Sequence, residues 1–301
     1  MTKNISVKKR KKKSPGDLAF DIVNTIVMVG LIIVAIYPVW YVVCASLSIP
    51  TAVTQNPGKL IWPVQLTFGA YAKAFQHPLI ISGFKNILII LICSLPLNLF
   101  MTLLCGYFMA AKNVMFKKYI VAFLVFTMFF SGGLIPIYLN QKSLGLYNNL
   151  WALIIPGALS IYNAIICRTA IEAVPDSLLE SAYMDGANEW TVLFRIVTPL
   201  IKPTLAVLTL YYGVSHWNSW FNASLYITDN SLLPIQNILR AILIVNNDML
   251  NQGTASMDSM DTFAETIKYA VIVISTLPIL CIYPFLQKYF VKGVMVGAVK
   301  G

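Results

Sequence analysis

Six long stretches of the sequence contain no charged residue, and they constrain the fold more than any other feature. They cover residues 22–58, 86–111, 119–141, 143–167, 203–228 and 269–287. A helix of roughly 20 apolar residues crosses the hydrocarbon core of a bilayer. The stretches lack a two-residue alternation and are too long for barrel strands, so we predict helices. The predicted crossings are centred near Ile33, Cys93, Val125, Ile155, Tyr212 and Leu277.

The composition agrees with an all-α polytopic membrane protein. Only 11% of the residues are charged and 58% are hydrophobic, whereas a soluble domain has about 25% charged residues. All five cysteines fall in apolar segments without metal-ligand spacing, and there are only two histidines, so we expect no metal site. The sequence has no G-x-x-x-x-G-K-[ST] phosphate loop. We therefore expect the chain to bind no cofactor, and ATP and magnesium to bind on separate subunits.

The distribution of lysine and arginine predicts the orientation. With the N-terminus inside, sixteen of the 22 basic residues lie on the inner side and six on the outer side. The positive-inside rule then places both termini in the cytoplasm of a multi-pass plasma-membrane protein. The net charge of +10 owes much to one basic run before the first crossing. We interpret that run as an orientation signal that contacts anionic lipid rather than nucleic acid.

A charged loop at about residues 172–203 separates the fourth and fifth crossings, and this orientation makes it cytoplasmic. Pro175 precedes a helix that Asp176 or Ser177 can cap, and Asn188 can cap a second helix. Gly186 between them predicts a bend, and Pro199 and Pro203 predict kinks before the fifth crossing. We expect two short helices that act as a lever across the cytoplasmic face. The alternative is an ordinary amphipathic connector.

The motif Glu-x-Ala-x-x-Asp-Gly-Ala in this loop resembles the coupling loop of ATP-binding-cassette importer permeases. Ser181 stands where that family usually has a second alanine. The resemblance implies the six-helix fold of type I importer permeases and two ATP-binding subunits docked on the loop. The residues expected to couple the chain to these ATPases are Glu180, Ala182, Asp185, Gly186, Ala187, Phe194, Ile196 and Pro199.

Three other segments narrow the resemblance to permeases for sugars. The C-terminal segment is similar to the tail of maltose-type (MalG-like) permeases, which reaches into the ATPase interface; a frayed polar end is the alternative. The matching tail residues are Gly293, Gly297, Ala298, Lys300 and Gly301. Residues 14–17 and 216–222 resemble the branch that includes the LplC and YtcP permeases, which serve importers of complex oligosaccharides.

Polar and aromatic side chains alternate in the fifth crossing, where polar groups are costly and usually face a cavity or a partner helix. Indole rings and amides together suit a sugar, which offers both C–H faces and hydroxyls. The candidates for a substrate path are Ser215, His216, Trp217, Asn218, Trp220 and Asn222. Ser219 belongs to the same run, and Ser94, Asn98 and Ser131 are weaker candidates. Hydrogen bonding between helices is the alternative.

These features predict three parts: a basic cytoplasmic tail (1–16), a six-helix permease domain (17–290) and a cytoplasmic C-terminal tail (291–301). External loops at about 49–80 and 229–266 are expected to receive an extracellular solute-binding lipoprotein, and a second homologous permease is expected to complete a heterodimer.

The predicted function is a non-enzymatic permease subunit of an ATP-driven sugar or oligosaccharide importer that works by alternating access. An anionic ligand would call for basic residues within the crossings, and there are none, so a neutral or weakly charged ligand fits better. The alternatives are an importer permease for peptides, amino acids or ions, and a secondary transporter, although no carboxylate lies in the six stretches. A membrane-embedded enzyme would need a cluster of catalytic groups at depth, where only His216 occurs.

Overall fold

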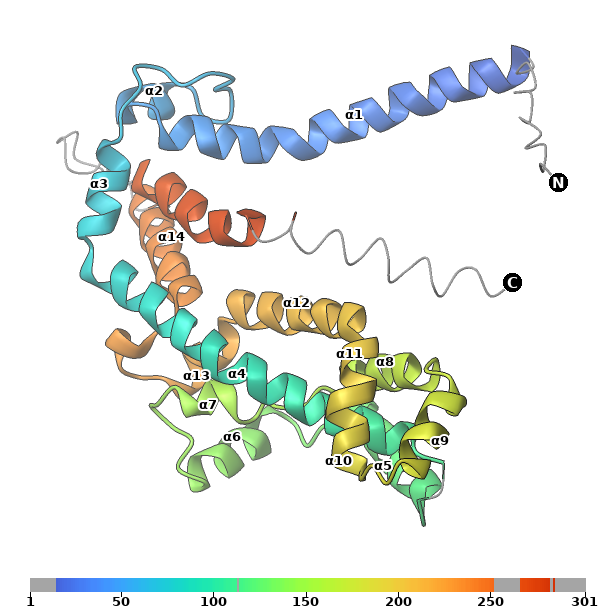
Figure 1. The fold of residues 1–301 in the computed structure, drawn as a ribbon. Coiled ribbons are helices and arrows are strands. Elements are labelled where there is room, and N and C mark those ends of the chain that lie inside the picture. The colour runs from blue at the N-terminus through green and yellow to red at the C-terminus, as the bar shows by residue number, and fades with distance from the viewer. Residues whose placement is uncertain (1–14, 113, 252–265, 282–283, 285–301) are drawn as a thin grey trace.

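The computed structural model describes residues 15–112, 114–251, 266–281 and 284, and within these ranges the regular structure is entirely helical (Figure 1). The predicted all-α class is therefore confirmed. The two longest helices are α1 (Pro15–Ser46) and α4 (Pro78–Ala110), and both are long and apolar enough to cross a membrane. The short helices α2 (Pro50–Gln55) and α3 (Gly69–Gln76) lie between them.

The α1 helix extends away from the other helices (Figure 1). Its buried residues are confined to its C-terminal end, at Cys44, Ala45 and Ser46. Most of its other apolar side chains are exposed, with Val34 at 71% and Ile33 at 63%. This helix thus presents a long apolar face that the described chain does not cover.

Other predicted crossings are broken or short rather than single long helices. The α5 helix (Lys117–Phe129) meets α6 (Leu134–Ser143) at 113°, after Gly133 with φ +89°. The segment predicted as the fourth crossing is divided into α7 (Trp151–Ile154) and α8 (Ile161–Glu172). Pro156 and Gly157 separate these helices, because proline lacks an amide proton and glycine stabilises helices poorly. The last apolar helix spans Thr266–Cys281.

The segment between α8 and the fifth crossing forms α9 (Asp176–Met184), α10 (Glu189–Thr191), the π-helix η1 (Val192–Val197) and α11 (Thr198–Leu200). The fifth crossing is α12 (Lys202–Asn218), and it meets the helical run Glu189–Leu200 at 83°. It is followed by α13 (Phe221–Tyr226), the 3-10 turn η2 (Asn230–Leu232) and α14 (Ile235–Asn251).

The central element is α4, which packs against α8, α12 and α14. Residues spaced by four along α4 are neighbours, and a run of them forms a stripe that winds slowly around the helix. Six such residues are buried: Asn86, Ile90, Ser94, Asn98, Thr102 and Gly106. Gly106 allows the close crossing with α8, because a Cβ at this position would lie 2.9 Å from the Cβ of Cys167. This face of α4 positions both candidate sites described below.

Candidate functional site

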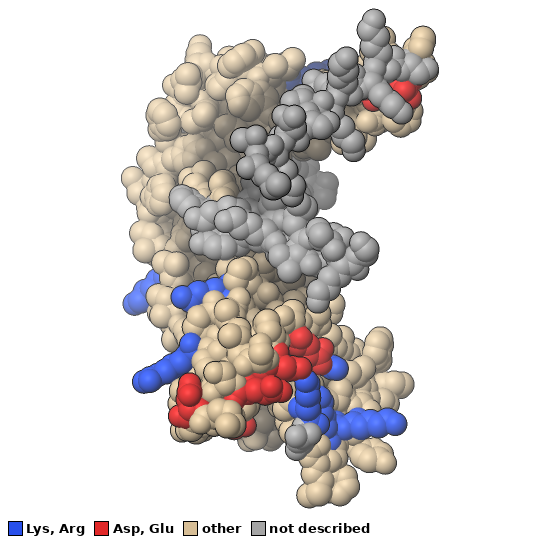
Figure 2. Space-filling model, turned by 45° about the vertical axis from the view of Figure 1, so that its right-hand side comes forward, with Lys and Arg blue, Asp and Glu red and all other residues tan. Residues whose placement is uncertain are grey.

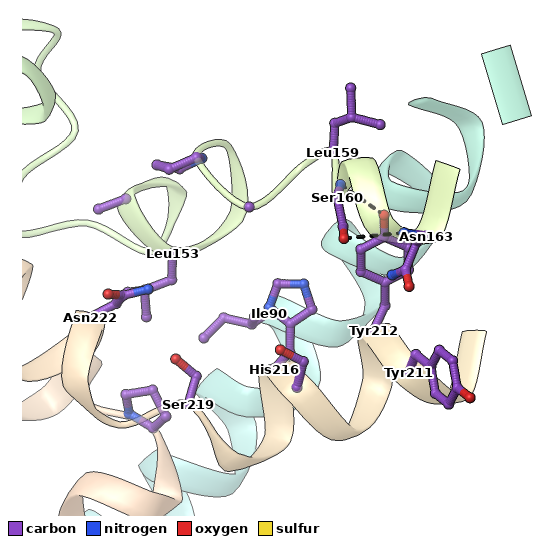
Figure 3. A pocket seen from close by; sticks show the side chains of 15 residues that line it. Ile90, Leu153, Leu159, Ser160, Asn163, Tyr211, Tyr212, His216, Ser219 and Asn222 are labelled. Carbon is purple, nitrogen blue, oxygen red and sulfur yellow. Dashed lines mark hydrogen bonds between the residues drawn. The ribbon is translucent and has the colours of Figure 1, made fainter. Parts of the chain in front are cut away.

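A cavity of about 270 Å³ lies between α4, the break between α7 and α8, and α12 (Figure 3). The side chains that line it are mostly hydroxyl, amide, imidazole and small apolar groups. The polar lining residues are Ser160, Asn163, Tyr211, Tyr212, Ser215, His216, Ser219 and Asn222. Such a wall can exchange hydrogen bonds with a neutral polar ligand.

Asn98 joins three elements around this cavity. Its Nδ2 donates to the carbonyl oxygen of Gly157 at 2.6 Å, and its Oδ1 lies 3.1 Å from Nε2 of His216. Because Oδ1 can only accept, Nε2 is assigned as the protonated nitrogen of His216. In the neutral ring Nδ1 is then an acceptor. Asn98 itself is fully buried, so these bonds satisfy its amide where water cannot.

Tyr212 forms a second polar link beside the cavity. Its hydroxyl lies 2.6 Å from Oγ1 of Thr102 on α4 and accepts the backbone N–H of Ser160 at 3.0 Å. The side chain of Ser160 accepts the backbone N–H of Asn163 and caps α8. The start of α8 is therefore joined to α12 and α4 through one phenol, and Figure 3 shows the bond between this phenol and Ser160.

The structure separates the predicted substrate-path residues into two groups. Ser215, His216 and Asn222 line the cavity, together with Ser219. The other three lie apart from it. Trp217 is buried and donates to the carbonyl of Ser275 at 3.1 Å, and Trp220 holds the guanidinium of Arg240 at 3.5 Å from its ring centroid. Asn218 is exposed.

Sequence reasoning missed four polar residues of the cavity: Ser160, Asn163, Tyr211 and Tyr212. A signal was present in the Pro156–Gly157 pair, which interrupts an apolar run and marks a break where backbone and polar groups can face a cavity. Of the weaker candidates, Asn98 contacts His216 as described. Ser94 is buried and donates to the carbonyl of Ile90, and Ser131 is exposed.

The charged loop has the predicted helix, bend and helix. Gly186 adopts φ +80° after α9, and its N–H donates to the carbonyl of Tyr183 at 3.0 Å. The N–H of Ala187 donates to the carbonyl of Ala182 at 2.9 Å. This pair of bonds is the Schellman motif, which needs a left-handed residue at the glycine position. Gly186 therefore sets the angle of the loop through its own backbone.

The predicted caps of the loop helices were correct in one case and wrong in the other. Asn188 caps α10, since its Oδ1 accepts the N–H of Thr191 at 2.8 Å. The N-cap of α9 is Pro175, which offers no side-chain acceptor, so the prediction of Asp176 or Ser177 is wrong. Asp176 instead forms an exposed ion pair with Lys112 at 2.6 Å. This hydrogen bond raises the pKa of Lys112 above its usual value.

The loop has an apolar side that packs on the helices and an acidic side that is exposed. Ala182 is buried, Ala187 and Ile196 are partly buried against the same core, and Pro199 is exposed just before the 83° bend. Phe194 stacks with Trp190 at 5.9 Å and Phe100 at 6.5 Å between ring centroids. The exposed acidic residues of this region are Glu172, Asp176, Glu180, Asp185 and Glu189. Figure 2 shows the band of acidic side chains, with basic ones beside it.

The tail residues singled out by the sequence, Gly293, Gly297, Ala298, Lys300 and Gly301, lie outside the described part of the chain. So do Ser14 and residues 252–265 of the predicted second external loop.

Comparison with known proteins identifies relatives of this architecture. Residues 65–296 match the family described as "Binding-protein-dependent transport system inner membrane component". The chain is 37% identical to Protein LplC of Bacillus subtilis over 94% of this chain and 95% of that protein. It is 36% identical to the polygalacturonan/rhamnogalacturonan transport system permease protein YtcP of the same organism, over 89% and 94%. A chain in the crystal structure of a bacterial ABC transporter that imports the acidic polysaccharide alginate has a TM-score of 0.84 at 30% identity. That alignment covers 93% of this chain and 99% of the other. The resemblance stated from the sequence is thereby confirmed.

Proposed function

Since the chain belongs to the family of binding-protein-dependent transport system inner membrane components, we propose that it is the permease subunit of an ATP-driven importer for a sugar or oligosaccharide. The observation that supports this most strongly is the match over residues 65–296, which includes both the polar cavity and the charged loop. The relatives named above include a permease for polygalacturonan and rhamnogalacturonan and a transporter for alginate.

The cavity supports a sugar as the transported molecule. Its serine, asparagine, tyrosine and histidine side chains can bind hydroxyls in both directions without a fixed charge. Its volume of about 270 Å³ is near the lower end of the roughly 300–1,000 Å³ of small-molecule sites. We therefore assign this subunit space for about one sugar unit and expect the second permease to hold the rest of an oligosaccharide.

The partners follow from the surfaces that the chain leaves exposed. The apolar face of α1 suits a second permease subunit within the membrane, because a face of this length is shielded from water only by lipid or protein. The acidic face of the loop is assigned to the ATP-binding subunits, of which the complex has two, and the loops at the opposite end of α4 to the solute-binding protein. The charged loop and both termini then lie in the cytoplasm, as the lysine and arginine distribution predicts.

The proposed mechanism is alternating access. The binding protein delivers the sugar to the outer side, and ATP closes the ATPase subunits against the loop. The bend at Gly186 and the 83° turn before α12 transmit this motion to the crossing that lines the cavity. The sugar and ATP shift the equilibrium only through different affinities for the outward and inward states.

Purification of the assembled complex tests this function. We expect a second permease and two ATPase copies to co-purify with the chain. In proteoliposomes, a sugar-loaded binding protein should stimulate both ATP hydrolysis and sugar uptake. The panel of sugars should include neutral oligosaccharides, oligogalacturonates and alginate oligosaccharides, so that the ligand class is decided by stimulation. Solute movement by the chain alone without ATP would favour a secondary transporter, and stimulation by a peptide or amino acid would replace the sugar assignment.

A further inference from the structure

Three side chains from separate elements meet where α4 ends beside the charged loop. Tyr107 lies in the last turn of α4, Tyr183 lies on α9, and Glu189 is the first residue of α10. Both phenols donate to the same carboxylate oxygen of Glu189, the bond from Tyr183 measuring 2.9 Å. The two phenol oxygens lie 3.3 Å apart. We call these three residues the tyrosine clamp.

The hydrogen bonds of the tyrosine clamp are of a strong kind, because their acceptor is a carboxylate. A hydrogen bond to an ionised carboxylate is roughly twice as strong as one between neutral groups. Tyr183 and Glu189 are exposed, and a tyrosine phenol is protonated at neutral pH, so Tyr183 can donate to the carboxylate. Tyr107 is partly buried on α4. The nearby Lys112–Asp176 pair also joins this region to α9, but its side chains are 73% and 60% exposed, and such pairs contribute little.

The same helix that ends in the tyrosine clamp also reaches the cavity. Asn98 bonds to Gly157 and contacts His216, and Thr102 contacts Tyr212. Asn98 and Tyr107 are nine residues apart, about 14 Å along an α-helix. A continuous helix transmits displacement along its axis, because its backbone hydrogen bonds resist local extension. A displacement of Tyr107 along this axis would therefore reach Asn98 and Thr102, which contact the cavity residues His216 and Tyr212.

We propose that the tyrosine clamp positions α4 relative to the coupling loop, so that a displacement of the loop by the ATPases shifts Asn98 and its contacts at the cavity. This inference rests on the proposed import function and adds a specific link to it. Tyr107 is the member on α4, whereas the Tyr183–Glu189 bond joins the two helices of the loop. Removal of the Tyr107 hydroxyl should therefore impair coupling more than removal of the Tyr183 hydroxyl.

The test measures sugar molecules imported per ATP hydrolysed, in proteoliposomes that contain the complete complex and its sugar-loaded binding protein. We expect Tyr107→Phe to lower this ratio roughly threefold to tenfold, the scale of one typical intramolecular hydrogen bond. ATP hydrolysis per assembled complex should change less than about twofold. A purely structural role would lower the amount of assembled complex and leave the ratio unchanged.

Further variants make the result specific. Glu189→Gln keeps an acceptor oxygen but removes the charge, and it should lower the ratio in the same direction. The double variant with Tyr107→Phe and Glu189→Gln should have a ratio no lower than that of the more severe single variant. The reason is that both substitutions act on the same contact, between Tyr107 and Glu189. Tyr119→Phe is the matched control: it removes a phenol hydroxyl that is on an exposed residue of α5, and the ratio should stay at the wild-type value.

The outcomes separate the clamp from the function on which it rests. A wild-type ratio in both Tyr107→Phe and Glu189→Gln overturns the tyrosine clamp while leaving the import function intact. Additive losses in the double variant also overturn it. Failure of the wild-type complex to import sugar with ATP overturns both. If Tyr107→Phe fails to assemble, the ratio in Glu189→Gln decides the question.

Discussion

At the scale of single residues, backbone conformation and buried polar contacts restrict substitution more than side-chain size does. Gly186 has φ +80° but open space around its Cβ position, so its requirement is purely conformational. Asn98 is restricted for the opposite reason, since its backbone is ordinary helix and both ends of its amide are bonded. The first residue shapes the surface proposed for the ATPases and the second shapes the cavity.

Gly186→Pro and Glu180→Lys are expected to uncouple ATP hydrolysis from uptake without preventing membrane insertion. Proline fixes φ near −65°, so the Schellman bonds of the loop are lost. Lysine at position 180 reverses an exposed charge on the acidic face. Uptake and ATPase rates in proteoliposomes measure the effect. Gly186→Asn is the control that should retain coupling, because asparagine tolerates positive φ. Normal transport in both Gly186→Pro and Glu180→Lys would contradict the assignment of this loop.

Asn98→Leu should destabilise the complex and reduce sugar uptake. The substitution leaves the Gly157 carbonyl and Nε2 of His216 without their partner, and each buried unsatisfied group costs about 1–3 kcal/mol. The midpoint of thermal unfolding in detergent reports the stability. Asn140→Leu on α6 makes the same chemical change at an exposed site and should have little effect. Equal shifts of the midpoint in the two variants would show that the Asn98 contacts are unimportant.

At the scale of elements, α4 determines how the other helices assemble. Its buried face combines amide and hydroxyl side chains with Gly106, so it can bond to α12 and also approach α8 closely. Small residues at helix crossings allow backbones to approach within a membrane, where packing and hydrogen bonds replace the hydrophobic effect as the source of association.

Gly106→Ala should therefore destabilise the fold, whereas Gly213→Ala should not. At position 106 the new Cβ would lie 2.9 Å from the Cβ of Cys167 and 3.2 Å from the backbone nitrogen of Arg168. Overpacking of this kind costs about 1–3 kcal/mol. At position 213 the nearest atom, Cδ2 of Leu95, is 4.0 Å away, so the better helix propensity of alanine should prevail. Thermal unfolding of the two variants side by side measures the difference, and equal stabilities would contradict the close crossing.

At the scale of the whole molecule, the described chain leaves two surfaces exposed that a complete transporter would cover. The α1 helix stands apart with an apolar face, and the acidic loop lies where α4 and α8 end (Figure 1). Both surfaces are consistent with a subunit whose remaining contacts come from other proteins and from lipid.

The orientation of this assembly can be tested by cysteine labelling. In a variant without the five native cysteines, Lys59→Cys should react with a membrane-impermeant maleimide in intact cells, because residue 59 is exposed in the predicted outer loop. Asp185→Cys, which is exposed on the charged loop, should react only after the membrane is permeabilised. The opposite pattern would reverse the proposed orientation.

The sequence by itself determined the helical class, the positions of the apolar segments and the loop with its bend at Gly186 and cap at Asn188. These features depend on local rules. Each charged residue is costly in the hydrocarbon core of the membrane, glycine permits positive φ, and asparagine caps helices. The tertiary structure decided that Asn98 meets His216 and Gly157, that Trp217 and Trp220 lie apart from the cavity, and that Tyr107 meets Glu189. The partners of Asn98 and Tyr107 are between 59 and 118 residues away in the chain. Only the packing of helices brings them together, and helix periodicity alone does not specify which faces pack.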